Sequence, residues 1–237
     1  MIKLILKVTL LTLIATCAVL GVKAQIGYDF SRWDIGTAVG LNQVYGDAET
    51  QTTTPSIHFN LTYNQTPYTN FVFEAQLGIF KGGDSLKTKL GRQFTNDFSA
   101  YVLRGQLQFG EFIDYSTSPV ANVIKNVYFS TGIGYLINHI TQITRYSLTQ
   151  PGLYSGGENY SQVPFIPFKI GYEFKLFNKY QQPSLKVDIG YQYNYVFGDN
   201  VDGYTYGKNN DIYTQFTLGI KFAIGGDIIS SKKQIHY

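Results

Sequence analysis

The clearest feature of this chain is a regular alternation of apolar and polar residues. In the stretch 57–64 the apolar residues are Ile57, Phe59, Leu61 and Tyr63, and the polar residues between them are His58, Asn60, Thr62 and Asn64. Successive side chains of a strand point to opposite faces, so this stretch predicts a strand with one apolar and one polar face.

Seven further segments follow the same rule and, together with 57–64, predict eight strands. They are 33–42, 71–79, 101–109, 127–138, 166–175, 185–195 and 212–222. Each is about ten residues long, close to the ~9–11 residues that a tilted strand needs to cross a bilayer. An even number of such strands predicts an all-β fold, a closed eight-stranded antiparallel transmembrane β-barrel over residues 25–224, followed by a short tail at 225–237.

The predicted connections alternate in length. Residues 43–55, 81–97, 145–162 and 197–211 are long and rich in Gly, Asn, Asp, Ser and Tyr, whereas 65–70 and 177–184 are short. Long loops on one side and short turns on the other are typical of bacterial outer-membrane barrels. The connection 110–126 is longer than this pattern requires, and we expect it to lie on the short-turn side as an irregular excursion.

Alternation alone does not say which face is inside. A soluble lipocalin-like barrel or β-sandwich would bury its apolar face. Three features favour an apolar exterior: the apolar face is uniform in all eight segments, the polar face carries glycine and long charged side chains, and aromatic residues lie near strand ends. The aromatic residues are Phe71, Phe109, Tyr195 and Phe222. We therefore expect a multi-pass protein of the bacterial outer membrane.

The first 24 residues predict a signal peptide. Lys3 and Lys7 precede an apolar run from Val8 to Leu20, and Val22-Lys23-Ala24 has small residues where signal peptidase reads them, so we expect cleavage before Gln25. A lipoprotein signal that is lipidated on Cys17 is an alternative. A retained transmembrane helix is another, although the apolar run is shorter than the ~20 residues that a span needs.

Composition narrows the classes of partner. Aromatic residues make up 16% and charged residues only 15% of the 237 residues, where a soluble domain carries about 25% charged residues. Three of the 19 Lys and Arg residues lie in the leader, which leaves 16 to balance 16 Asp and Glu. The sequence contains no basic stripe of the kind that binds nucleic acid. Because Cys17 is the single cysteine, internal disulfides and cysteine-based zinc sites are excluded.

The inward polar face predicts a charged lumen. Its expected members are Asp34, His58, Glu74, Arg104, Lys169, Glu173, Lys186, Asp188 and Lys221. An eight-stranded barrel has an interior just wide enough to be filled by side chains, and buried charges must be paired or hydrated. A network of ion pairs that plugs the lumen is the main interpretation, and a narrow gated ion path through rearranging pairs is the alternative.

The sequence predicts no catalytic, metal or cofactor site. Barrel enzymes that act on lipid A or peptides need a nucleophile, a base and an orienting group near the outer rim. His139 lies near such a rim but has no matching Ser or Asp nearby, His58 points inward and His236 lies in the tail. An enzyme built on His139 is the alternative function, and the three scattered histidines lack metal-ligand spacing.

The outer loops carry tyrosines that suit either recognition or anchoring. They are Tyr146, Tyr154, Tyr160, Tyr204 and Tyr206. Tyr gives rigid amphipathic contact area to binding surfaces, but it also anchors at the lipopolysaccharide interface, and both interpretations stay open.

The last strand resembles the C-terminal β-signal that the barrel-assembly machinery recognises. Residues 217–224 read polar-x-Gly-x-x-aromatic-x-apolar, with Gly219, Phe222 and Ile224 at the characteristic positions. The arrangement departs from the usual one because residues 225–237 follow it.

The mature chain also resembles the small outer-membrane β-barrel proteins of Bacteroidota, in its Ala24-Gln25 junction, its richness in Tyr and Asn and its segment 164–172. Stretch 91–109 resembles one barrel component of type IX protein secretion. The resemblance implies a non-enzymatic barrel that serves membrane structure, surface interaction or a secretion assembly. Expected partners are outer-membrane lipid and lipopolysaccharide, the barrel-assembly machinery and a protein of a surface or secretion complex.

Overall fold

The structure is a computed structural model, and it describes residues 29–115, 118–150, 152–205 and 210–230. The predicted signal peptide (residues 1–24), its cleavage site, Cys17, Tyr206 and His236 lie outside these ranges.

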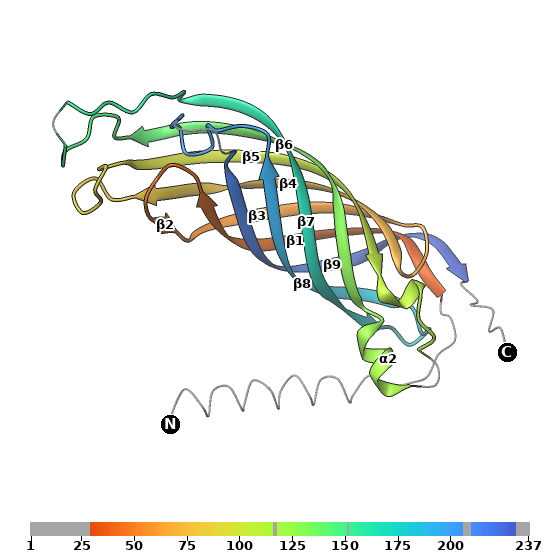
Figure 1. The fold of residues 1–237 in the computed structure, drawn as a ribbon. Helices are drawn as coiled ribbons and strands as arrows, with labels where there is room; N and C mark the ends of the chain where they lie inside the picture. The colour runs from red at the N-terminus through yellow and green to blue at the C-terminus, as the bar shows by residue number, and fades with distance from the viewer. Residues whose placement is uncertain (1–28, 116–117, 151, 206–209, 231–237) are drawn as a thin grey trace.

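The described residues form a closed β-barrel of eight long strands (Figure 1). The strands are β1 (Asp29–Tyr45), β3 (Thr54–Asn64), β4 (Thr69–Gly83), β5 (Gln93–Gln108), β6 (Val127–Ile143), β7 (Tyr160–Phe177), β8 (Pro183–Val196) and β9 (Ile212–Ser230). Each pairs antiparallel with its neighbours, and β1 pairs with β9 to close the ring, with Ile35 opposite Phe222. A two-residue strand, β2 (Gln51–Thr52), pairs with the end of β4. The predicted fold class, a closed eight-stranded antiparallel barrel, is confirmed.

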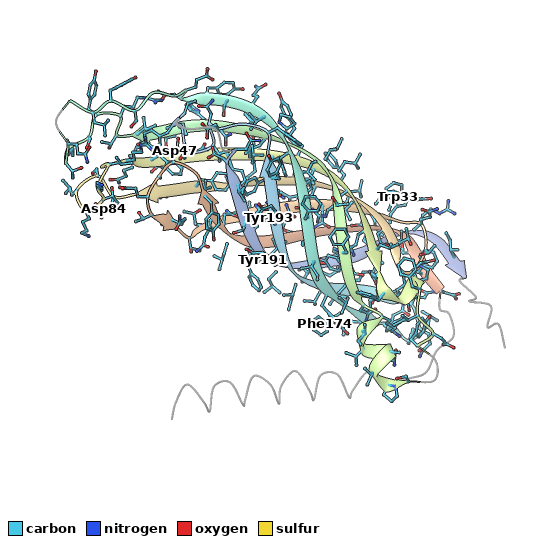
Figure 2. All side chains as sticks on the ribbon, viewed as in Figure 1. Trp33, Asp47, Asp84, Phe174, Tyr191 and Tyr193 are labelled. Carbon is cyan, nitrogen blue, oxygen red and sulfur yellow. The ribbon has the colours of Figure 1, made fainter. Side chains whose placement is uncertain are left out.

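The two faces of each strand point as the alternation predicted. Phe59 is 51% exposed, whereas Glu74 on the neighbouring strand is 2% exposed. We call the outward apolar residues of the long strands the apolar belt. It includes Trp33, Ile35, Phe59, Phe73, Leu103, Ile133, Ile170, Tyr191 and Leu218. Figure 2 shows Trp33 and Phe174 at the outer edge of the barrel. A soluble barrel, with its apolar face inside, is not what the chain forms.

The connections divide the barrel into two ends. The loop end carries residues 46–53, 84–92, 144–159 and 197–211, and the turn end carries 65–68, 109–126 and 178–182. The long connection at the turn end contains a 3-10 turn, η1 (Phe109–Glu111), and a short helix, α2 (Pro119–Ile124). Figure 1 shows α2 at the end of the barrel away from the long loops. The expected excursion is therefore real and has regular structure of its own.

The last strand is longer than its alternation suggested. β9 continues to Ser230, where it pairs with Asp29 of β1, so the barrel does not end at residue 224. Two consecutive glycines, Gly225 and Gly226, interrupt the apolar pattern. Backbone pairing with β1 needs no side chain, and it resumes beyond the glycines after a register shift between Ser31 and Trp33.

The barrel interior has three layers. At the loop end a buried apolar cluster contains Val44, Phe80, Phe94, Val201 and Tyr204, and at the turn end Phe30, Tyr68 and Tyr115 form a smaller one. Polar and charged side chains fill the space between them. The sequence predicted only this middle layer. Among the described residues, no helix has the length and apolar character that a membrane-spanning helix needs.

Candidate functional site

The structure places all nine residues of the predicted charged lumen inside the barrel. Each of them is at most 5% exposed. They come from seven strands. Each strand contributes inward side chains, because every second residue of a barrel strand points to the axis. They form three groups of ion pairs rather than one continuous chain.

The first group joins Lys186 of β8 to Asp34 of β1. The Lys186 Nζ lies 2.6 Å from Asp34 Oδ2. Asn64 of β3 donates to the same carboxylate oxygen at 2.9 Å. The group therefore links β8 to β3 across the seam where the first and last strands pair.

The second group is centred on Lys221 of β9. Its Nζ lies 2.8 Å from Glu173 and 3.4 Å from Asp188, and Asp188 in turn lies 3.2 Å from Lys169. Tyr128 donates its hydroxyl proton to Asp188 at 3.1 Å. Two cations and two anions thus alternate, so each buried charge has an opposite neighbour.

One charge of the second group was missed. Lys175 of β7 lies 4.0 Å from Glu173 and donates to the carbonyl oxygen of Pro67 and to Gln108, both at 2.7 Å. The sequence placed Lys175 on the inward face without assigning it to the network. Lys175 lies at the turn end, where it reaches a backbone carbonyl of the 65–68 turn. This contact depends on the tertiary structure and could not be predicted from the alternation.

The third group is built around Glu74. Arg104 Nη2 donates to Glu74 Oε2 at 2.7 Å, and Gln76 donates to Oε1 at 2.7 Å. His58 Nδ1 lies 3.2 Å from the same Oε1, and His58 Nε2 lies 2.8 Å from the hydroxyl of Ser56. Ser56 lies just before the predicted segment 57–64 and shares the inward parity of His58 two residues later.

Ser56, His58 and Glu74 have the connectivity of a hydrolytic triad, but their surroundings oppose that chemistry. Ser56 donates its proton to Asn42 Oδ1 at 3.0 Å, so the hydroxyl proton points away from His58 Nε2, the atom that would have to accept it. All three residues are less than 10% exposed. A nucleophile needs a base and an open approach for the substrate carbonyl. The arrangement serves as a hydrogen-bond relay between β1, β3 and β4.

Above the charges, towards the loop end, four aromatic rings close the lumen. We call Phe80, Phe98, Phe165 and Tyr213 the aromatic plug. The Phe80 and Phe98 rings stack at 3.9 Å with an interplanar angle of 4°, and Tyr213 lies 5.1 Å from Phe80 and 5.5 Å from Phe165. Phe80, Phe98 and Phe165 were missed because they lie just beyond the ends of the predicted segments 71–79, 101–109 and 166–175. Tyr213 lay on the inward face of 212–222 but was not assigned a role.

The loops fold over the aromatic plug as a connected cap. Asp202 of the β8–β9 loop accepts from the backbone N–H groups of Asp47 and Ala48 at 2.6 and 3.1 Å. Arg92 of the β4–β5 loop donates to the Asp47 carbonyl at 2.9 Å, and Arg145 of the β6–β7 loop donates to the Gly203 carbonyl at 3.1 Å. All four loops are therefore tied together.

Two carboxylates lie close together inside this loop cap. Asp202 and Asp211 both approach Gly46, where a methyl group would lie within 2.6 Å of each. Burial, followed by the other carboxylate, raises the pKa of Asp211 to about 8, and burial raises the pKa of Asp202 to about 6. Only glycine leaves room for both groups at this position.

Only part of the predicted tyrosine surface is exposed. Tyr146, Tyr154 and Tyr160 are more than half exposed, and the Tyr146 and Tyr154 rings lie 5.0 Å apart. Tyr204 is instead fully buried, and its hydroxyl accepts from the Gln93 N–H at 2.9 Å. The prediction of an exposed Tyr204 was wrong, because its loop folds inward over the barrel mouth.

His139 lies on the outside of the barrel near the loop end. It is exposed and stands directly across from Asp97 of β5 and Tyr160 of β7. Within the described residues, no three His, Cys, Asp or Glu side chains are arranged to hold a metal ion. Gly219 of the predicted assembly signal faces inward beside Ala38, whereas Phe222 and Ile224 face outward in the apolar belt.

Comparison with known proteins found similar folds but no family. No family model and no curated protein sequence matches the chain. Among solved structures, the chain is similar to the neisserial surface protein A, at 12% identity over 83% of this chain and 99% of that chain, with a TM-score of 0.43. It is also similar to the attachment invasion locus protein Ail of Yersinia pestis, at 10% identity over 81% of this chain and 97% of that one, with a TM-score of 0.42. It is also similar to the outer membrane protein OprG of Pseudomonas aeruginosa, at 11% identity over 84% of this chain and 99% of that chain, with a TM-score of 0.36. The fold assignment made above rests on the strand pairing.

Proposed function

We propose that this chain is a non-enzymatic integral protein of the bacterial outer membrane, with a sealed lumen and a working surface on its loops. The apolar belt carries this proposal. In water, a closed ring of exposed Phe, Leu, Ile and Tyr side chains is unfavourable at about 25 cal/mol per Å², whereas in a bilayer it faces hydrocarbon. The closed barrel leaves no unpaired strand edge in that layer.

The filled interior favours a sealed barrel rather than an ion channel. An ion moving along the axis would have to displace the stacked rings of Phe80 and Phe98 and then separate ion pairs such as Lys186–Asp34. Removing one partner of a buried pair costs about 3–5 kcal/mol. The filled interior therefore favours mechanical stability over conduction.

The exposed side of the loops supports a role in surface interaction. Tyr146, Leu148 and Tyr154 are 69%, 63% and 54% exposed, and a cap tied by hydrogen bonds holds their loop in place. Pre-ordered aromatic side chains bind at low entropic cost. Lipopolysaccharide and a protein of a surface or secretion complex are the proposed partners, and the barrel-assembly machinery is the proposed insertion partner. In its more specific version, the proposal is that the chain is one of the Bacteroidota barrel proteins and serves in a type IX secretion assembly.

The experiment is to express the full chain in a Gram-negative host and to separate its membranes. We expect the protein in the outer-membrane fraction, in the detergent-rich phase of a Triton X-114 partition, with a faster gel migration before heating than after. In planar bilayers the purified barrel should give no steady current. Recovery of a folded protein in the aqueous phase would refute the membrane assignment, and steady conductance would refute the sealed lumen.

A further inference from the structure

The turn end carries apolar surface that the apolar belt does not include. Val120, Val123 and Ile124 of α2 are 66%, 36% and 41% exposed. Their spacing of three and four residues places them on one face of the helix. Asn122 is two residues from Val120, which places it on the opposite side of the helix, and it is half-buried. Phe112, which is 69% exposed, precedes the helix in the same connection.

Several contacts hold the helix in place. Ser118 caps it by accepting from the Ala121 N–H, and Pro119 occupies its first turn. Ala121 packs on the buried cluster of Phe30, Tyr68 and Tyr115. The apolar face is therefore presented by a fixed helix that is docked on the barrel.

A further contact places α2 on the membrane side of the turn end. Tyr172 of β7 donates its hydroxyl proton to the Val123 carbonyl at 3.0 Å. Tyr172 has the outward parity of Phe174, and the two rings lie 4.5 Å apart. Phe174 belongs to the apolar belt, so the exposed face of α2 continues the belt beyond the strands.

We propose that α2 is an interfacial anchor whose Val120, Val123 and Ile124 insert into the membrane leaflet at the turn end. This inference rests on the proposed membrane location. Its occupant is lipid, because the surface is apolar and continuous with the belt. A short amphipathic helix fixed at this depth buries its apolar face at the boundary between headgroups and acyl chains. The anchor resists tilting of the barrel on the side of β7.

Tryptophan fluorescence in lipid vesicles tests the anchor. Trp33 is the only tryptophan of the chain and lies in the belt, so W33F provides a silent background. V120W in this background places a probe on the exposed face, and N122W places a matched probe two residues away on the other face. The probes are read in vesicles of phosphatidylcholine with bromine atoms near the headgroup end of the acyl chains.

We expect brominated lipid to reduce the V120W emission roughly twofold, while N122W on the half-buried side of the helix loses little. I124W on the same face repeats the measurement if V120W lacks the heat-modifiable migration of the folded barrel. Equal quenching of V120W and N122W would overturn the anchor. So would a V120W emission that is shielded from acrylamide in proportion to protein concentration without lipid quenching, which would indicate a second copy of the chain.

Trp33 in the unaltered protein distinguishes a failure of the membrane location from a failure of the α2 anchor. If no brominated lipid quenches Trp33, whether its bromines lie near the headgroups or deep in the acyl chains, the membrane location itself fails. If Trp33 is quenched and V120W is not, only the anchor fails.

Discussion

Removing Lys186 is the sharpest test of the charged lumen. The substitution K186M keeps an unbranched side chain of similar length and deletes the ammonium group that lies 2.6 Å from Asp34. Asp34 is 0% exposed, so water cannot replace the lost partner without opening the barrel. Asn64 remains as a donor at 2.9 Å, and one neutral amide cannot balance a buried carboxylate.

The expected loss in the free energy of unfolding is about 3–5 kcal/mol, the cost of leaving one member of a buried pair without its partner. With a urea dependence of about 2–3 kcal/mol per M, the unfolding midpoint should fall by about 1–2.5 M. The double variant D34N/K186M removes both charges and should recover most of this loss.

The assay is urea unfolding of the vesicle-bound barrel, followed by the loss of its fast-migrating band on an unheated gel. The matched control is K81M, because Lys81 is an exposed lysine near the loop end of β4, and its loss should stay within about 0.5 kcal/mol. A K186M midpoint equal to that of K81M would show that the lumen pairs do not stabilise the barrel. A double variant as unstable as K186M would show that the loss arises from packing rather than charge.

Three further predictions concern the other layers. F80A should cost about 3–5 kcal/mol in the same assay, as for other buried Phe to Ala changes, because Phe80 is 0% exposed; an unchanged midpoint would contradict the aromatic plug. Burial raises the pKa of Asp202 to about 6 and of Asp211 to about 8, so the protonated carboxyls stabilise the loop cap below about pH 4 and this contribution is lost as the pH rises through both values. Amide exchange in residues 197–205, corrected for intrinsic rates, should therefore be faster at pH 9 than at pH 5. D211N should lose this pH dependence, and the control D84N should keep it. Equal pH dependence in the two variants would exclude the Asp202–Asp211 pair as its cause. The folded protein should not react with a fluorophosphonate probe, and labelling that disappears in S56A would instead reveal a hydrolytic serine at Ser56.

Alternation along the chain determined the fold and the contents of the middle layer. His58, Glu74 and Lys186 could be assigned to the lumen because a strand has a period of two, and a single apolar face in eight strands leaves one consistent way to close them. The same reasoning stopped short of Phe80 and Ser230, because β4 and β9 extend beyond the ~9–11 residues that a bilayer crossing needs.

What the chain determined by itself is therefore the face on which each strand residue lies, since that depends only on local backbone geometry. The partners of those residues, such as Asp34 for Lys186 or Asp202 for Asp47, are more than 150 residues apart and are set by strand register and barrel closure. The inward fold of Tyr204 and the docking of α2 against Tyr172 also belong to the tertiary structure. Loops and short helices take their positions from the surfaces that they cover, and no local pattern encodes those surfaces.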